Sequence, residues 1–579
     1  MFSWLRKYSR ASAASARERA QALHQQGALA NQSGRHHEAA KLLAGAIAAQ
    51  PDIAEIHVEM GRAMRSLAEP ARAVTCFRRA IEIEPAHLDA HIDLASVLLA
   101  LENMEPAERA ARGALSIDAR SVAAQVNLGA ALEGQGKFDQ AADCYRAAIA
   151  IDPESVAALA NLCGVCLRLG YLDEAARSIE RALSFAPQDP EMHLRHGNVL
   201  LERRQPERAA DSYREALRLR PGLTTACNSL GLAQDLQGNM GSAMEWYERA
   251  LALDPEDVSA HLNRAANWLR AEDFARGWEE NEWRLHSREY APLYARFALP
   301  RWDGSSLAGR RILVYAEQGL GDEIMYASCL PDVIAQAAHC VIDCEPRLAG
   351  LFRASFPQAT VHGGKQTDAV DWLDAVGPLD VAIPAGSLAR FLRRTPESFP
   401  AHPGYLRAAP ARVTAWRARL KDLGPGRKIG LSWRGGVPQT GRGSRSIALV
   451  DLLPVLRLPG QVFVNLQYDR CNEELAEMRT RHGVTIHHWP EAIEDYDETA
   501  ALVSAVDLTL SVCTAVVDLG GALGRPVWVI APVRTDFRYG VKGEAMRWYP
   551  SVRIFRQASY GNWDPVILAV AAALSGSSA

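Results

Sequence analysis

A period of 34 residues runs through the first half of this 579-residue chain and constrains its fold more than any other feature. Prolines recur at that spacing, with Ala119 in the one missing place, at Pro51, Pro85, Pro153, Pro187, Pro221 and Pro255. A lane of small residues runs in phase with them, at Gly27, Gly61, Ala95, Gly129, Gly197 and Gly231. Self-similarity at this period is typical of a solenoid built from repeated helix pairs.

Each repeat unit reads as two amphipathic helices joined by a short polar turn, as in VAAQVNLGAALEGQGKFDQAADCYRAAIAIDPES from Val122. Small residues allow the two helices to approach closely, and the proline ends the second helix. This pattern resembles the tetratricopeptide repeat. The repeats predict an array over residues 20–284, with seven full repeats and a capping repeat. Residues 1–19 before it are predicted to be a basic N-terminal segment.

The first helices of such an array line a groove that binds extended peptides. Their sixth positions carry side chains that could form a ladder for a peptide backbone, since asparagine offers both a donor and an acceptor. The candidates for this peptide-binding groove are Asp93, Asn127, Asn161 and Asn263. A solvated helix face explains the same residues equally well, and both interpretations stay open.

Charge and apolar content exclude several functional classes. The chain has 64 Lys and Arg against 68 Asp and Glu, so its net charge of -4 gives no general attraction for nucleic acid. No apolar run is long enough to span a bilayer. The first ten residues have the positive charges of an export signal, but the segment ASAASARERAQ after them lacks its apolar core, which predicts a cytoplasmic protein with reduced cysteines. Residues 1–10 are the only predicted point of membrane contact. Cys163 and Cys166 are interpreted as helix packing, and no metal is expected.

The second half alternates short apolar runs with amphipathic segments. The runs are RILVYA, HCVIDCE, DVAIPA, KIGLSWR, QVFVNLQ, TIHHWP, DLTLSV and VWVIAP. Strands that are apolar on both faces and separated by helices indicate parallel sheets covered on both sides. The predicted fold is therefore α + α/β: an α-solenoid, a connector at residues 285–309, and two doubly wound α/β domains at 310–426 and 427–579.

Ligands of open α/β sheets bind beyond the carboxyl ends of the strands, which selects the candidate site. After the first strand, QGLGDEI carries two glycines, Gly319 and Gly321. Asp322 follows them, where a helix is expected to begin. After DLTLSV, Thr514 begins a helix whose first amides suit a phosphate. Each could equally be an ordinary helix cap.

Basic and aromatic residues follow the other strands of the last domain. Arg434 ends KIGLSWR, and the glycine-rich loop after it carries Arg442 and Arg445, whose guanidinium groups suit a diphosphate or simply contact solvent. Gln467 and Trp489 end two further strands. We expect both side chains to point into a cleft between the two α/β domains, where Trp489 would stack on a base or pack.

The segments QGLGDEI, IGLSWRGG with SRSIAL, VNLQYD, DYDETAALVSAVDLTLSVCTAVVDLGGALGRPVWVIAP and WYPSVRIFRQ keep their order along the chain. Together they resemble the glycosyltransferase domain of bacterial tetratricopeptide glycosyltransferases. That domain is similar to the heptosyltransferases of lipopolysaccharide synthesis and, more distantly, to repeat-bearing O-linked N-acetylglucosamine transferases.

The resemblance implies a metal-independent, inverting enzyme of the two-domain GT-B fold that uses a nucleotide-sugar. Asp322 would be the general base, in a loop with Gly319 and Gly321. The last domain would hold the donor, and the residues expected there are Arg434, Arg445, Gln467, Trp489, Thr514, Ala515, Gly520 and Gly521. The repeats would recruit the acceptor protein, and a flagellin-like surface subunit is the acceptor that the analogy suggests.

Two residues depart from the pattern of the heptosyltransferase-like enzymes. Their Asp-Thr motif is Cys513 and Thr514 here, and the His five positions after that Asp is Asp518. An acid beside a diphosphate is repulsive unless an arginine offsets it. Two alternatives to a protein glycosyltransferase therefore stay open. One is a scaffold with a degenerate transferase domain, and the other is a transferase that acts on a lipid-linked glycan.

Overall fold

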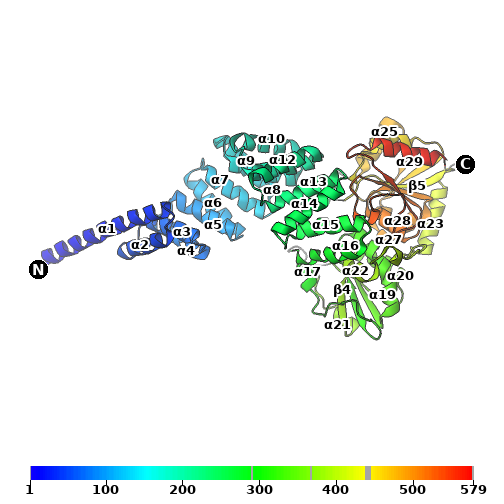
Figure 1. Ribbon diagram of the computed structural model, residues 1–579, viewed down its shortest axis with the longest axis horizontal. Helices are drawn as coiled ribbons and strands as arrows, with labels where there is room; N and C mark the ends of the chain where they lie inside the picture. Colours follow the sequence, from blue (N-terminus) through cyan, green and yellow to red (C-terminus); the bar gives the residue numbers. More distant parts are fainter. Residues whose placement is uncertain (1, 288–290, 366–367, 437–444, 577–579) are drawn as a thin grey trace. The chain divides into compact units, whose positions relative to one another are not determined.

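The computed structural model describes residues 2–287, 291–365, 368–436 and 445–576, in two compact units that divide after Pro221 (Figure 1). The first unit consists of consecutive helices that pack in pairs, as the repeat pattern predicts. They are α1 (Phe2–Gln32), α2 (His36–Ala49), α3 (Ala54–Ser66), α4 (Pro70–Ile83), α5 (Leu88–Ala100), α6 (Met104–Ile117), α7 (Val122–Gly134), α8 (Phe138–Ile151), α9 (Val156–Leu169), α10 (Leu172–Phe185), α11 (Pro190–Glu202) and α12 (Pro206–Leu219). Helix α1 begins at Phe2, so the predicted N-terminal segment is continuous with the first repeat helix.

The lane of small residues is explained by the side chain that lies 16 positions later. A methyl group added at Gly129 would lie 2.5 Å from the Tyr145 ring, and one at Gly197 would lie 2.4 Å from the Tyr213 ring. The same pairing joins Gly61 to Phe77 and Gly231 to Tyr247. Where the lane carries Ala95, the residue 16 positions on is the small Ala111. The repeats with a glycine in this lane therefore pack it against a large side chain, and the repeat with Ala95 has two small residues at these positions.

This pairing predicts that Gly197→Ala destabilises the first unit by about 1–3 kcal/mol, because the buried Tyr213 ring must move. The double variant Gly197→Ala/Tyr213→Ala should lose less stability than the sum of the two single variants, since it recreates the pairing of Ala95 with Ala111. Urea unfolding followed by far-ultraviolet circular dichroism measures both effects. Strictly additive losses would show that the two side chains do not compete for the same space.

The second unit begins with the last repeat helices. These are α13 (Thr224–Leu236), α14 (Met240–Leu253), α15 (Val258–Arg270) and the short α16 (Phe274–Asn281), which runs into a 3-10 turn, η1 (Glu282–His286). The loss of repeat length after Phe274 agrees with a capping repeat. Among the described helices of the whole chain, none is long and apolar enough to cross a membrane.

Two parallel sheets follow the repeats within this unit. The first has the order β3-β2-β1-β4, with strands β1 (Arg311–Tyr315), β2 (His339–Cys344), β3 (Thr360–Gly363) and β4 (Val381–Pro384). The second has the order β10-β9-β8-β5-β6-β7, with strands β5 (Arg427–Ser432), β6 (Gln461–Asn465), β7 (Ile486–His487), β8 (Leu508–Val512), β9 (Val527–Ala531) and β10 (Val552–Arg556). The predicted divisions at residues 310 and 427 fall directly before the first strand of each sheet.

Helices precede, connect and follow the strands of both sheets (Figure 1). They are α17 (Ala291–Ala295), α18 (Leu320–Tyr326), α19 (Leu330–Gln336), α20 (Ala349–Ser355), α21 (Leu373–Val376), α22 (Leu388–Leu392), α23 (Pro410–Lys421), α24 (Leu453–Leu456), α25 (Asn472–His482), α26 (Glu491–Glu494), α27 (Tyr496–Ala505), α28 (Ala515–Ala522) and α29 (Asp564–Gly576). All eight apolar runs are strands. The strands β3 and β10 were not predicted, because their sequences, TVHG and VRIFR, are interrupted by polar residues and contain no continuous apolar run.

A buried ion pair joins the capping repeat to the first sheet. Arg284 of η1, only 3% exposed, donates to both carboxylate oxygens of Glu317, at 3.1 and 2.9 Å, just after β1. Glu317 is 1% exposed and also accepts from the Tyr294 hydroxyl at 2.8 Å and the Gly386 amide at 2.6 Å. This network fixes the chain two residues before the Gly319 turn.

Candidate functional site

A cleft of about 670 Å³ opens at the carboxyl ends of strands from both sheets. Three of the residues selected from the sequence line it together: Asp322 from α18 after β1, Thr514 after β8, and Arg445 from the loop that follows β5. Gly319, Gly321 and Ala515 line it as well. The rule that ligand sites follow parallel strands therefore brings residues from the first and last α/β domains to one place.

Helices α18 and α28 cross closely at the edge of this cleft. A methyl group at Gly321 would lie 2.8 Å from a carboxylate oxygen of Asp518 and 3.4 Å from the Ala515 Cα. Gly319 is the N-cap of α18, and its carbonyl accepts from the amides of Asp322 and Glu323. The glycine at position 321 thus permits helix contact, which is a packing reason that the sequence analysis did not consider.

Thr514 is the N-cap of α28. Its hydroxyl accepts from the Val516 amide at 3.2 Å and lies 3.1 Å from the Ser511 hydroxyl. The residue before it, Cys513, is 3% exposed, and burial raises the pKa of its thiol to about 12. Position 513 therefore carries a neutral thiol at the start of α28, where the helix amides favour an anion.

One guanidinium group holds three carboxylates on the wall of the cleft. Arg538, in the 3-10 turn η9 (Phe537–Tyr539) after β9, forms an ion pair with Asp322. Its other nitrogens donate to Asp518, at 3.2 Å to both oxygens, and to Asp536 at 3.2 Å. Arg538 is thus the arginine that offsets the acid at position 518.

These acids differ in their electrostatic environment. Burial raises the pKa of Asp518 to about 7, against the attraction of Arg538, and the charges of Asp322 and Asp536 raise it further. Burial also acts to raise the pKa of Asp536. The charges of Arg538 and Arg445 act to lower it and outweigh burial, so the pKa of Asp536 is lowered. Asp518 therefore titrates near neutral pH, whereas Asp536 stays ionised.

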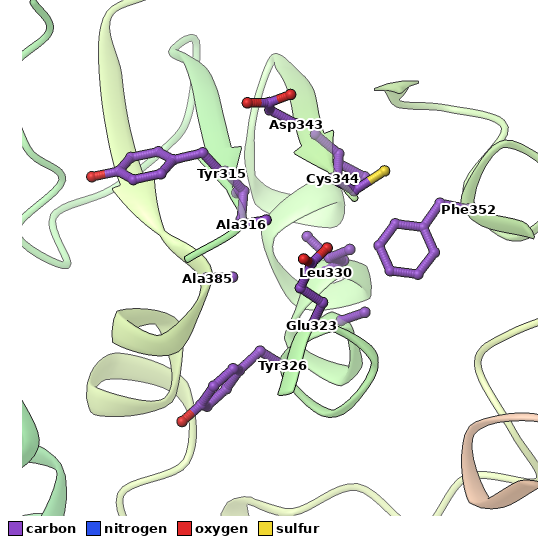
Figure 2. A pocket seen from close by; sticks show the side chains of 12 residues that line it. Tyr315, Ala316, Glu323, Tyr326, Leu330, Asp343, Cys344, Phe352 and Ala385 are labelled. Atoms are coloured by element: carbon purple, nitrogen blue, oxygen red, sulfur yellow. The ribbon is translucent and has the colours of Figure 1, made fainter. Parts of the chain in front are cut away.

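Glu323, the neighbour of Asp322, faces elsewhere. It lines a separate cavity of about 20 Å³ beneath β1 and β2, and Figure 2 shows its carboxyl pointing into that cavity beside Leu330. Burial raises the pKa of Glu323 to about 8, although its carboxylate accepts from the Glu345 amide at 2.9 Å. Of the two consecutive acids, only Asp322 lines the cleft.

Five predicted donor residues lie outside the cleft lining: Arg434, Gln467, Trp489, Gly520 and Gly521. Arg434 is held in ion pairs with Asp469, at 2.6 Å, and Glu474. The expectation that Gln467 and Trp489 point into the cleft does not hold. Gln467 is 1% exposed, and its side-chain oxygen accepts from the amides of Trp433 and Arg434 at 3.1 and 2.9 Å. It therefore holds the end of β5 in place.

Trp489 packs against α23. Its ring lies 5.2 Å from the ring of Trp416, and the Arg419 guanidinium lies 4.7 Å from its centre. Gly520 and Gly521 serve packing as well, because added methyl groups would lie 2.5 Å from Val527 and 2.3 Å from the Tyr549 ring. These glycines let α28 lie close to its neighbours and do not line the cleft.

The glycine-rich loop after β5 is described only in part. Arg442 lies outside the described residues. Arg445 is described, and its backbone is close to the end of β8, since a methyl group at Gly435 would lie 3.1 Å from the Arg445 carbonyl oxygen and 2.8 Å from that of Cys513. This contact places the return of the loop beside Thr514.

Several predicted groove residues contact the preceding repeat. Asp93 accepts from Arg62 at 2.7 Å and from Arg65 at 2.9 Å, so its carboxylate is used in ion pairs between repeats. Asn127 donates to the Ile92 carbonyl at 3.1 Å, and Asn263 donates to the Asn228 side chain at 3.0 Å. Both bonds span 35 positions. Asn161 is partly exposed in α9. The ladder thus joins neighbouring repeats, and its use by a peptide stays a prediction.

The sequence analysis missed Arg538 and Asp536, although a usable signal exists. They follow β9, which is the neighbour of β8 in the sheet, in the segment RTDFRYG. Applying the strand-end rule to VWVIAP would have selected this segment together with Thr514. Also missed were further residues that line the cleft, among them Arg347, Tyr468, Glu494, Tyr496 and Tyr539.

Comparison with known proteins supports the repeat array. Models of the tetratricopeptide repeat match residues 58–122, 132–195 and 194–276. Protein FlbA of Caulobacter vibrioides is 36% identical over 382 residues, which are 62% of this chain and 63% of FlbA, so the match spans less than two thirds of that protein.

Two solved structures also align with the chain. The Cut9–Hcn1 hetero-tetramer of APC/C is 15% identical over 41% of this chain and 47% of the solved chain, with a TM-score of 0.38. YrrB, a TPR protein with an unusual peptide-binding site, is 21% identical over 32% of this chain and 95% of its own, with a TM-score of 0.28. With the family models and the helix pairs, the prediction is confirmed that the first half of the chain is an array of tetratricopeptide repeats.

Proposed function

We propose that this chain is a metal-independent, inverting glycosyltransferase of the GT-B type that moves a sugar from a nucleotide-sugar to a protein hydroxyl. The observation that carries the proposal is one cleft lined by a carboxylate, Asp322, by Arg445, and by the helix start at Thr514. These are the three parts that a displacement at a sugar carbon requires: a base, a cation for the leaving diphosphate, and the amides of a helix start.

The proposed reaction is a single displacement. Asp322 takes the proton from the acceptor hydroxyl as its oxygen bonds to the sugar carbon, and the bond to the diphosphate breaks with inversion. Arg445 and the first amides of α28 stabilise the charge that develops on the departing phosphate. The ion pair with Arg538 fixes the Asp322 carboxylate at the edge of the cleft.

The repeat array supports a protein as the acceptor, because tetratricopeptide arrays bind peptides and proteins. Holding the acceptor beside the cleft raises its effective concentration. A flagellin-like subunit is an acceptor proposed by analogy alone. A scaffold without activity is the second candidate, and the observation that favours it is the Asp322 carboxylate engaged by Arg538 in a cleft wall rich in acids.

A nucleotide-binding screen tests the donor site. The purified chain is titrated with UDP, GDP, ADP, CDP and dTDP in EDTA, and we expect one of them to raise the melting temperature. Arg445→Ala should weaken its binding by about 10- to 100-fold, since a charge-assisted hydrogen bond contributes about 1.5–3 kcal/mol. Arg434→Ala, which removes an arginine outside the cleft lining, is the matched control.

Equal losses of nucleotide affinity in Arg445→Ala and Arg434→Ala would show that the diphosphate does not bind beside Arg445. Stabilisation by none of the five nucleotides would favour the scaffold.

A further inference from the structure

Around Arg538, the cleft wall carries more acid than this one arginine can neutralise. The Arg538 guanidinium donates to Asp322, Asp518 and Asp536, and its side chain is 7% exposed. An incoming diphosphate adds negative charge to a wall that already has three carboxylates around one cation. Without compensation, this charge opposes the binding of any nucleotide-sugar in the proposed cleft.

Asp518 is the most enclosed of these acids. It is 2% exposed, and besides Arg538 it accepts from the Tyr549 hydroxyl at 3.2 Å. The titratable and charged groups that face it from the surrounding elements are Asp322 of α18, Asp536, Arg538 and Tyr539 around η9, Tyr496 of α27, and Tyr405 and Tyr549. Burial raises the pKa of each of these tyrosines, so they are neutral near pH 7. Arg538 is therefore the cation that Asp518 shares with two other acids.

The following inference rests on the proposed function, because it takes a nucleoside diphosphate as the ligand. We propose that Asp518 takes up a proton from solvent when the diphosphate enters the cleft, which leaves Arg538 with two carboxylates in place of three. The net charge of Arg538 and its three acids then changes from about -2 to about -1, so the cluster repels the incoming anion less. Protonated Asp518 is neutral, which removes the repulsion expected from an acid at this position.

The environment of the three acids selects Asp518 for this role. Asp322 is 27% exposed, whereas Asp518 is enclosed, and the pKa of Asp536 is lowered. The pKa of Asp518 is raised to about 7, chiefly by burial, so little free energy is needed to protonate it. A nearby anion raises the pKa of a carboxyl group further, which is the direction that proton uptake requires.

Linkage between proton binding by Asp518 and diphosphate binding fixes the direction in which the affinity changes with pH. Below the pKa of the free protein, Asp518 is already protonated, and diphosphate affinity does not depend on it. Above that pKa, each unit of pH weakens the affinity by up to about tenfold until the pKa of the complex is reached. Binding therefore weakens as the pH rises above neutral.

Calorimetry on the full chain tests the proposal directly. The nucleoside diphosphate with the largest thermal shift among UDP, GDP, ADP, CDP and dTDP is titrated in EDTA at pH 8.0, in two buffers with different ionisation enthalpies. We expect net proton uptake in the natural chain and none in Asp518→Asn. Glu494→Gln, which neutralises an exposed acid that lines the same cleft, is the matched control and should keep the uptake.

Dissociation constants give a second readout. Asp518→Asn should match the natural chain at pH 6.5 and bind about tenfold more tightly at pH 8.5, and the comparison cancels the titration of the nucleotide itself. Tyr549→Phe removes a hydrogen bond to ionised Asp518, so the midpoint of the fall in nucleotide affinity with pH should move to higher pH. This variant tests the proposal if Asp518→Asn does not fold.

The two hypotheses fail in different ways. Diphosphate binding with equal proton uptake in the natural chain and in Asp518→Asn would overturn the role of Asp518 and leave the donor site intact. An unchanged pH midpoint in Tyr549→Phe would overturn it as well. Absence of nucleotide binding at both pH values in all variants would overturn the proposed function together with this inference.

Discussion

Asp322→Asn should lower kcat for sugar transfer by about 10²- to 10⁴-fold, the contribution typical of a general base. The amide keeps the shape of the side chain and cannot accept the acceptor's proton. Nucleotide binding should be unchanged or tighter, because Arg538 loses one of its three carboxylate partners. Release of nucleoside diphosphate from the nucleotide-sugar, measured with acceptor protein present, gives kcat, and calorimetry gives the binding constant.

Glu323→Gln is the matched control for this prediction. Glu323 is the next residue of the same helix, but it faces the small cavity beneath β1 and β2, and its pKa of about 8 keeps it mostly neutral at pH 7. Glutamine therefore changes its charge little, and we expect transfer within about threefold of the natural rate. Equal rates in Asp322→Asn and in the natural chain would show that another group is the base.

Arg284→Met should destabilise the second unit by about 3–5 kcal/mol, because it leaves Glu317 as a buried charge without its cation. The side chains of both residues are nearly inaccessible, at 4% and 1% exposure. Trp4 is the only tryptophan before Gly222, so tryptophan fluorescence during unfolding reports on the second unit. Thermal and urea transitions followed by fluorescence measure the loss.

Two variants support this measurement. Arg276→Met breaks an exposed ion pair with Asp273, and exposed pairs contribute about 0–1 kcal/mol. Combining Arg284→Met with Glu317→Gln should recover part of the loss, since no unpaired charge is then buried. A loss below about 1 kcal/mol for Arg284→Met alone would contradict the importance of this ion pair.

Features with a regular period along the chain could be predicted from the sequence. The 34-residue repeat and the eight apolar runs need no knowledge of distant contacts, because helix pairing and parallel strands follow from local patterns. The close approach of helices at the glycine lane was also predicted, but the partner of each glycine was not. Why Gly197 is glycine depends on Tyr213, its partner 16 positions later, and this becomes plain only when the two helices are packed.

The site was predictable only where topology alone decides it. Asp322 and Thr514 were found because they follow strands at the same edge of their sheets. Arg434 was placed in the cleft because it also follows a strand, yet its partners Asp469 and Glu474 lie 35 and 40 positions away and turn it elsewhere. Arg538 also follows a strand, so the same rule selects its segment, but its role depends on Asp322, 216 positions earlier.

Transfer of a labelled sugar tests the central claim most directly. The purified chain is incubated in EDTA with radiolabelled nucleotide-sugars and an extract of cells that lack this chain, in parallel with Asp322→Asn. We expect label in material that resists lipid extraction and is released by protease, and none of it with Asp322→Asn. Label in the lipid extract would contradict a protein acceptor, and absence of any transfer in the natural chain would contradict the enzyme.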